Sequence, residues 1–225
     1  MGGALRPETG PPERMTETPD ILLNGPHDAA LTLVLAHGAG ALMDSLFMDA
    51  FAEGIAAGGF RVARFEFPYM AQRRETGKKR PPDRAPVLEA TWHKVIDHLG
   101  SPANTVIGGK SMGGRIASMI ADDAGVAGLV CLGYPFHPPG KPERTRTAHL
   151  EELRTPALIV QGERDTLGNR ADVAGYTLAS TIEMVWLPDG DHSFKPRKAS
   201  GHTEQENWNC GIERILAFMA ALSGA

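Results

Sequence analysis

The chain has 225 residues, 42% of them hydrophobic and 22% charged, which is enough for one domain with a full-sized core. Its formal net charge of −4 gives no basic footprint for nucleic acid or an anionic membrane. The two cysteines make no disulfide framework, no apolar stretch approaches the ~20 residues that span a bilayer, and the N-terminus lacks the apolar segment of a secretory signal. These properties predict a cytoplasmic protein without a nucleic-acid or membrane partner.

Residues 1–18 differ in composition from the rest of the chain. They are rich in Pro, Gly, Glu and Thr, which is typical of a disordered leader. We therefore predict a leader over 1–18 and a single domain over 19–225.

After the leader, short apolar runs alternate with longer helical patterns. Strands are expected at 31–36, 61–67, 105–108, 128–132, 157–161 and 182–187, with an edge strand at 20–24. Helices are expected at 44–57, 86–99, 112–124, 171–179 and 204–222. Buried strands that alternate with helices predict a mostly parallel sheet covered on both faces. The charged run at 73–84 is interpreted as a solvated loop, with substrate gating as the alternative.

The stretch GGKSMGG, residues 108–114, fits two motifs with different chemistry. As the end of a phosphate-binding loop it would need glycine where Asn104 stands, and the β-branched residues that follow Asn104 suit a strand. As a nucleophile elbow it has the strand before Ser111, the helix after it, and small residues at Gly109 and Gly113. The elbow is therefore favoured, with an ordinary capping serine as the simpler alternative.

A base and its orienting acid should follow the nucleophile in chain order. Asp165 comes after the expected strand 157–161, and His192 comes after the expected strand 182–187. Because the carboxyl ends of parallel strands meet at one edge, Ser111, Asp165 and His192 are predicted to lie together. Four other residues were considered for related roles: Glu163, Asp189 and Asp191 as alternative acids, and His202 as a solvated histidine.

An oxyanion hole is expected where the strand 31–36 runs into His37-Gly38-Ala39-Gly40. The backbone N–H groups of Ala39 and Met112 are the predicted donors. The candidates for the substrate pocket are His37, Gly40, Tyr134 and His137, although a structural role for His37 and a plain loop role for His137 are open. Lys110 and Arg115 are expected to carry surface charge. No spacing of Cys, His and Asp suggests a metal site, and no cofactor is implied.

The segments AHGAG, GGKSMGG, VQGERD and DGDHSF resemble the α/β-hydrolase superfamily, and more closely its small lidless members related to dienelactone hydrolase. A group of predicted hydrolases is also similar in LAHGAGALMDSLFM, GGKSMGGR and GYPFHPPGKPE. The resemblance implies an α/β-hydrolase fold without a lid domain and a serine hydrolase. Serine stands at the elbow where dienelactone hydrolase has cysteine, so the resemblance does not extend to that substrate.

Two further interpretations differ in class. A dinucleotide-binding site would use Gly38 and Gly40, but Met43 stands where its third glycine belongs. A non-catalytic scaffold that keeps the fold for binding is the alternative to an enzyme, because a fold does not prove a function. We predict a serine esterase that acts on a small ester, thioester or lactone through an acyl-enzyme.

Overall fold

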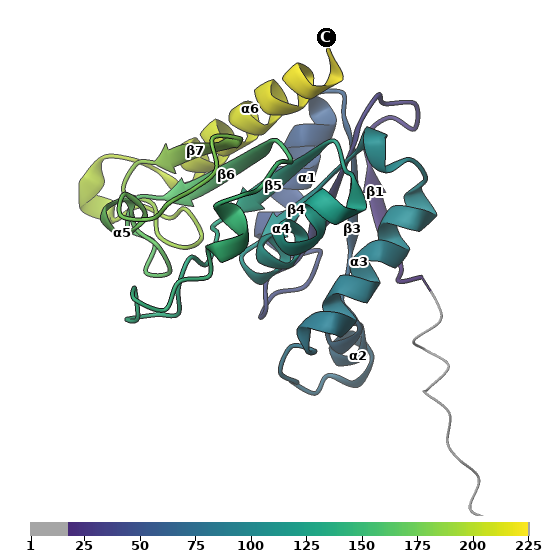
Figure 1. Cartoon of the computed structure of the whole chain (residues 1–225), viewed down its shortest axis with the longest axis horizontal. Helices are drawn as coiled ribbons and strands as arrows, with labels where there is room; N and C mark the ends of the chain where they lie inside the picture. The colour runs from purple at the N-terminus through teal and green to yellow at the C-terminus, as the bar shows by residue number, and fades with distance from the viewer. Residues whose placement is uncertain (1–17, 225) are drawn as a thin grey trace, which may run out of the picture.

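The computed structural model describes residues 18–224, and its centre is one mostly parallel sheet (Figure 1). The strand order in space is β1-β3-β2-β4-β5-β6-β7, and only β1 runs antiparallel to its neighbour. The strands are β1 Ile21–Asn24, β2 Thr32–Ala36, β3 Arg61–Phe65, β4 Thr105–Lys110, β5 Gly128–Leu132, β6 Ala157–Gly162 and β7 Ile182–Leu187. The expected fold class and the edge strand are confirmed.

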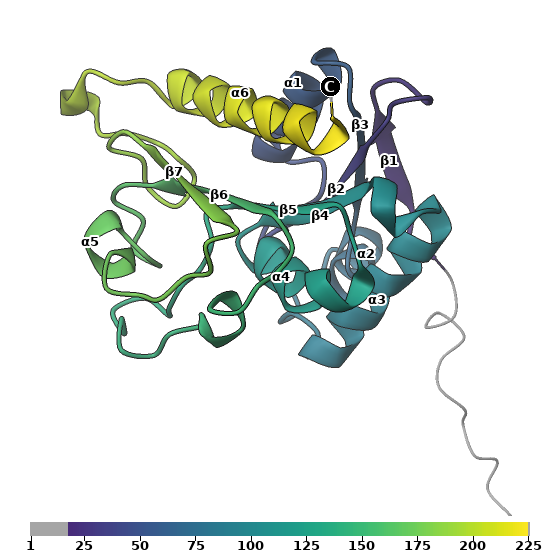
Figure 2. The same cartoon turned by 45° about the horizontal axis from the view of Figure 1, so that its top comes forward.

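Helices cover both faces of this sheet, as Figure 2 shows. One face carries α1 Leu46–Ala57 and α6 Glu204–Ser223; the other carries α2 Pro68–Thr76, α3 Ala85–Leu99 and α4 Met112–Ala124. A short helix, α5 Arg170–Val173, precedes β7. Within the part of the chain that the structure describes, no helix is both long and apolar enough to cross a membrane.

The alternation of side chains along the strands creates a separate core on each face. In β2, Val34 and Ala36 join the core under α3 and α4, whereas Leu33 and Leu35 join the core under α1 and α6. All four are fully buried, because a central parallel strand has no solvent side. The two cores fix the sheet between the helices and hold the strand ends in place.

The charged run at 73–84 was expected to be a loop, but part of it is helical. Its first residues belong to α2, which begins at Pro68 and ends before Gly77, a glycine in the left-handed conformation. Arg74 forms ion pairs with Glu66 and Asp44, so this part of the run is tied to the fold. The expectation of a solvated loop is therefore wrong for residues 73–76.

The helix expected at 171–179 is also shorter than predicted. Only Arg170–Val173 is helical, with a capping box at Asn169. The chain then turns away, because the Ala179 N–H donates to the Leu150 carbonyl across the structure. The predicted leader lies, except for Thr18, outside the described residues and stays a prediction.

Parallel strands bring their carboxyl ends to one edge of the sheet. The arrowheads of β6 and β7 point toward the side of α5 in Figure 1, and β2, β4 and β5 run parallel to them. The loops after these five strands therefore share this edge, where open α/β sheets bind their ligands.

Candidate active site

The turn between β4 and α4 holds Ser111 in a rare conformation. Its φ of 52° is positive, which non-glycine residues seldom adopt and which marks a strained turn. A Cβ on Gly109 or Gly113 would lie 2.1 or 2.5 Å from the carbonyl oxygen of Ala36 on β2. Glycine is required at both positions because the turn passes so close to that strand. This is the strand–turn–helix geometry expected of a nucleophile elbow.

Ser111, His192 and Asp165 form a continuous chain of hydrogen bonds. The Oγ of Ser111 lies 2.9 Å from Nε2 of His192, and Nδ1 of His192 lies 2.7 Å from Oδ2 of Asp165. An ionised carboxylate can only accept, so Nδ1 carries the hydrogen and Nε2 is free to accept from the serine. The structure thus brings together the three residues that the sequence pattern singled out.

Asp165 is fully buried, and its carboxylate has further donors. Gln161 Nε2 donates to Oδ2 at 2.9 Å, and the backbone N–H of Leu167 donates to Oδ1 at 2.8 Å. Hydrogen bonds to the charged form compensate for the loss of water around a buried carboxylate. Gln161 also donates to the carbonyl of Tyr134, so it links the acid to the loop after β5.

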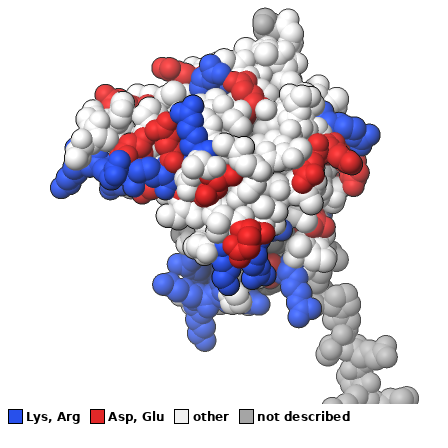
Figure 3. Space-filling model, turned by 60° about the vertical axis from the view of Figure 1, so that its left-hand side comes forward, with Lys and Arg blue, Asp and Glu red and all other residues white. Residues whose placement is uncertain are grey.

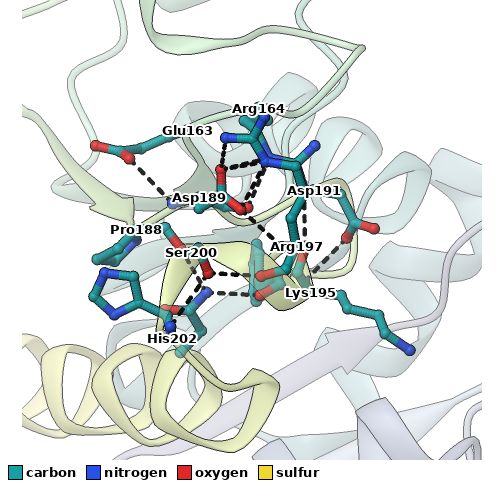
Figure 4. Close-up of polar contacts among 11 residues, drawn as sticks. Glu163, Arg164, Pro188, Asp189, Asp191, Lys195, Arg197, Ser200 and His202 are labelled. Carbon is teal, nitrogen blue, oxygen red and sulfur yellow. Dashed lines mark hydrogen bonds and ion pairs between the residues drawn. The ribbon is translucent and has the colours of Figure 1, made fainter.

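The two alternative acids beside His192 are engaged elsewhere, as Figure 4 shows. The carboxylate of Asp189 binds Arg197 and Arg164, and its pKa is held at about 2, first of all by the hydrogen bond from Arg197. Asp191 Oδ1 accepts from the backbone N–H groups of Ser193 and Lys195. Both carboxylates therefore hold the loop that carries His192 in shape.

The loop after β2 lies against the turn that carries Ser111. A Cβ on Gly38 would be 3.7 Å from the Ser111 Cβ. The Tyr69 hydroxyl donates to the Ala39 carbonyl at 3.1 Å, so this loop is held from α2. The N–H groups of Ala39 and Met112 donate to no acceptor within residues 18–224. Two unused donors beside a serine are what an oxyanion hole needs.

Lys110, which was expected to carry surface charge, is buried. Its Nζ donates to the His192 carbonyl oxygen at 2.5 Å and lies 5.5 Å from the Phe47 ring and 5.9 Å from the Phe194 ring. Burial lowers the pKa of Lys110 to about 8. Sequence reasoning missed this contact, as it missed the role of Gln161. The signal for Lys110 was its position at the end of a strand in which every other residue is buried.

Three of the four predicted pocket residues are buried and cannot line an open pocket. His37 and Tyr134 are 0% exposed and His137 is 2% exposed. His37 Nε2 accepts from the Phe67 N–H, the Tyr134 hydroxyl donates to the Arg146 carbonyl, and His137 contacts Asp172. These side chains brace the loops after β2 and β5, and burial lowers the pKa of His37. Only Gly40 is exposed, next to Ala39.

The candidate site opens on the molecular surface. The side chain of His192 is 30% exposed, and Ser111 is half-buried. A cavity of about 690 Å³ is lined by residues of α2 and α3, among them Tyr69 and Thr91, and by none of the three hydrogen-bonded residues. Residues 18–224 contain no group of three or more His, Cys, Asp or Glu side chains placed to hold a metal ion.

Comparison with known proteins identifies similar folds. The solved structures that match the fold include an alpha-beta serine hydrolase homologue from Coxiella burnetii, an a/b serine hydrolase without lid from Xanthomonas campestris, and Est1E from Butyrivibrio proteoclasticus. Their identities are 20%, 18% and 13%, with TM-scores of 0.62, 0.63 and 0.63. The matches cover 87%, 87% and 89% of this chain and 90%, 88% and 94% of the others.

At these identities the solved structures establish the fold alone. The family model described as "Alpha/beta hydrolase domain" matches residues 29–220, which is most of the chain. Membership in that family supports hydrolase activity. The chain belongs to the alpha/beta hydrolase domain family.

Proposed function

We propose that this protein is a serine hydrolase that cleaves carboxylester-like acyl bonds through an acyl-enzyme intermediate. The observation that carries the proposal is the hydrogen-bonded chain from Ser111 through His192 to Asp165, with the serine on a strained elbow. The roles of nucleophile, base and orienting acid follow from the direction of these bonds.

In the first half of the reaction, Nε2 of His192 takes the hydroxyl proton as Ser111 Oγ attacks the carbonyl carbon of the ester. The carbonyl oxygen becomes an oxyanion, which the N–H groups of Ala39 and Met112 stabilise, assisted by the positive end of the α4 dipole. Asp165 stays ionised, holds the imidazole in the required tautomer and stabilises its positive form. When the intermediate collapses, His192 gives its proton to the departing alcohol.

In the second half, His192 takes a proton from water, and the resulting hydroxide attacks the acyl-serine carbonyl. The same two N–H groups stabilise the second oxyanion, and collapse returns the proton from His192 to Ser111 Oγ as the acid leaves. No atom or electron beyond those of the ester and water is needed.

The substrate we favour is a small carboxylester, with thioesters and lactones next. An amide asks more of the acid step because its amine is a poorer leaving group. Between β5 and β6 the chain forms only the short helical turn Ala148–Leu150, so no lid covers the site from this segment. An uncovered site fits short or compact acyl groups better than long chains that need a closed apolar tunnel.

The direct test is fluorophosphonate labelling followed by turnover of short and long p-nitrophenyl esters. The protein should be labelled once, at Ser111, and should hydrolyse short esters without activation at an oil–water interface. Ser180→Ala, a change at an exposed serine, is the matched control and should be labelled normally. A folded protein that resists the label and stays inert toward esters, thioesters and lactones would overturn the proposal in favour of a non-catalytic scaffold.

A further inference from the structure

The arginines between residues 18 and 224 differ in their partners. Seven form ion pairs with carboxylates: Arg64, Arg74, Arg154, Arg164, Arg170, Arg197 and Arg214. In contrast, six arginine side chains have no hydrogen bond or ion pair with any residue between 18 and 224: Arg61, Arg80, Arg84, Arg115, Arg144 and Arg146. Among these six, Arg115 has a buried Nε atom. Lys and Arg side chains lie in several separate groups on the face in Figure 3, divided by acidic and uncharged surface.

Arg115 lies one helical turn beyond Ser111 on α4. Its backbone N–H donates to the Ser111 carbonyl at 3.0 Å. Residues 115 and 118 share one face of α4 because they are three positions apart, and Ser111 is the N-cap residue before the first turn. That face looks toward the segment after β5, since Ser118 Oγ lies 2.8 Å from His149 Nε2. The Nε atom of Arg115 is buried and has no hydrogen-bond partner.

Arg146 comes to the same place from the loop after β5. Its N–H donates to the Phe136 carbonyl at 2.7 Å, and its carbonyl accepts from the Tyr134 hydroxyl at 3.0 Å. This loop begins at Gly133, where a Cβ would lie 3.4 Å from the His192 ring. Arg146 is therefore anchored to a loop that starts against the catalytic histidine.

The charges of these guanidinium groups act on one another. Burial, and then the positive charge of Arg115, lower the pKa of Arg146, and the same two causes lower the pKa of His149. The carboxylates of Asp165 and Asp172 have other partners: Asp165 binds His192, and Asp172 binds His137 and Asn169. The exposed Glu143 forms no ion pair with either arginine within the described chain.

Two partly buried guanidinium groups without a counter-ion are costly, and a bound anion would remove that cost. Guanidinium groups bind carboxylates and other oxyanions through paired, charge-assisted hydrogen bonds. We propose that Arg115 and Arg146 form an anion subsite beside Ser111, which selects esters that carry a carboxylate group. The inference rests on the proposed function, because it names the substrate class of the same site.

Matched pairs of esters test this subsite. On the acyl side, p-nitrophenyl hydrogen adipate is compared with neutral p-nitrophenyl hexanoate, and on the alcohol side, 4-acetoxybenzoate with neutral 4-acetoxybenzamide. The wild type should prefer the anionic member of at least one pair in kcat/KM. The preference should fall about 10- to 100-fold in Arg115→Gln or Arg146→Gln, the range for losing a hydrogen bond to a charged group.

Three controls test whether a lost preference comes from the subsite, from charge alone or from unfolding. Arg61→Gln alters an unpaired arginine at the first residue of β3, the opposite end of the strands from Ser111, and should leave both members of each pair unchanged. Arg115→Lys keeps the charge without the paired geometry and should recover part of the preference. Circular dichroism checks that each variant is folded.

Free adipate should competitively inhibit hydrolysis of the neutral ester. Stronger inhibition by inorganic phosphate than by adipate would assign the subsite to phosphate and overturn the carboxylate class.

The outcomes distinguish the two proposals. Turnover of neutral esters without any preference for the anionic members overturns the subsite and leaves the serine hydrolase standing. A preference that stays unchanged in Arg115→Gln, Arg146→Gln and the double variant also overturns it. Failure to turn over either member of any pair overturns the proposed function, and the subsite with it.

Discussion

Two serines of this protein each contact a histidine at nearly the same distance. The two contacts differ in the burial of the serine, its backbone conformation and the direction of the hydrogen bond. Ser111 Oγ lies 2.9 Å from His192 Nε2, and Ser118 Oγ lies 2.8 Å from His149 Nε2. Ser111 is half-buried on a strained turn, whereas Ser118 is 2% exposed in the middle of α4. Ser111 directly precedes α4 and Ser118 lies within it, so nearness to this helix alone does not separate the two serines.

The two contacts have opposite polarity. Ser118 donates its hydroxyl proton to the Arg115 carbonyl at 2.7 Å, so His149 Nε2 must donate to the serine oxygen. At the other contact, His192 Nδ1 faces Asp165, so Nε2 is left to accept the proton of Ser111. A histidine that already donates cannot act as a base toward its serine. The contact of Ser111 is suitable for nucleophilic catalysis because a carboxylate lies on the far side of the His192 ring. The contact of Ser118 has no such carboxylate within residues 18–224 and is a packing contact.

Replacing each serine with alanine should give the largest difference in kcat between the two contacts. Ser111→Ala should lower kcat by a factor on the order of 10⁶, as loss of the nucleophile does in a serine protease. Fluorophosphonate labelling should disappear with it, while Ser118→Ala should still be labelled. Labelling of Ser111→Ala at the wild-type level, or its loss in folded Ser118→Ala, would contradict this difference.

Removing the carboxylate should make the first contact resemble the second. Asp165→Asn favours the tautomer in which His192 Nε2 carries the hydrogen, so kcat should fall by about 10⁴. The matched controls are Asp189→Asn and Asp191→Asn, whose carboxylates hold the surrounding loop. Steady-state kinetics on one short ester compares all three variants, and a larger loss in Asp191→Asn than in Asp165→Asn would mean that the acid is misassigned.

The two histidines also differ in their backbone contacts, because the buried Lys110 Nζ donates a hydrogen bond to the His192 carbonyl. Burial lowers the pKa of Lys110 from 10.5 to about 8. Below pH 8 the lysine is charged in both the folded and the unfolded chain, so the folded protein bears the full free-energy cost of burying the charge. Between about pH 8 and 10.5 the unfolded chain keeps a proton that the folded protein has released, so the free energy of unfolding should rise with pH. The rise should be about 3 kcal/mol relative to Lys110→Met, at 1.36 kcal/mol per pKa unit.

Urea unfolding of both proteins from pH 7 to 10.5 measures this difference. A difference between wild type and Lys110→Met that stays constant with pH would show that the lysine titrates alike in both states.

The hydrogen-bonded chain of Ser111, His192 and Asp165 could be predicted from sequence because each residue follows the carboxyl end of a parallel strand in the order of this fold. The burial of Lys110 could not, because the groups that accommodate its charge, Phe47, Phe194 and the His192 carbonyl, lie far along the chain. Helix α2 was missed for a similar reason. Its polar sequence has little apolar periodicity, and its Arg74 is fixed by Glu66 and Asp44 from other elements.

The buried histidines show a second limit. His37 and His137 follow strand ends, so the pattern placed them correctly at the site edge, but it does not say which way a loop side chain turns. In the structure both turn inward and bind backbone atoms, His37 at the Gly38 carbonyl and His137 at the Pro138 carbonyl. The direction of a loop side chain depends on distant contacts that a local pattern does not contain.

The smallest expected effect concerns a histidine–carboxylate pair that contacts no serine in the part of the chain that the structure describes. His137 Nε2 lies 3.2 Å from Asp172 Oδ2, and the same oxygen accepts from the side chain of Asn169 in the capping box of α5. Asp172→Asn weakens the cap and this contact, so the free energy of unfolding should fall by about 1 kcal/mol, as for loss of a helix cap. Turnover and fluorophosphonate labelling should match the wild type, because the pair contributes to stability and carries no proton to a substrate. Urea unfolding and ester kinetics on one preparation decide the matter: a loss of kcat comparable to that of Asp165→Asn would mean that this second pair takes part in the reaction, and the contrast drawn between the histidines would fail.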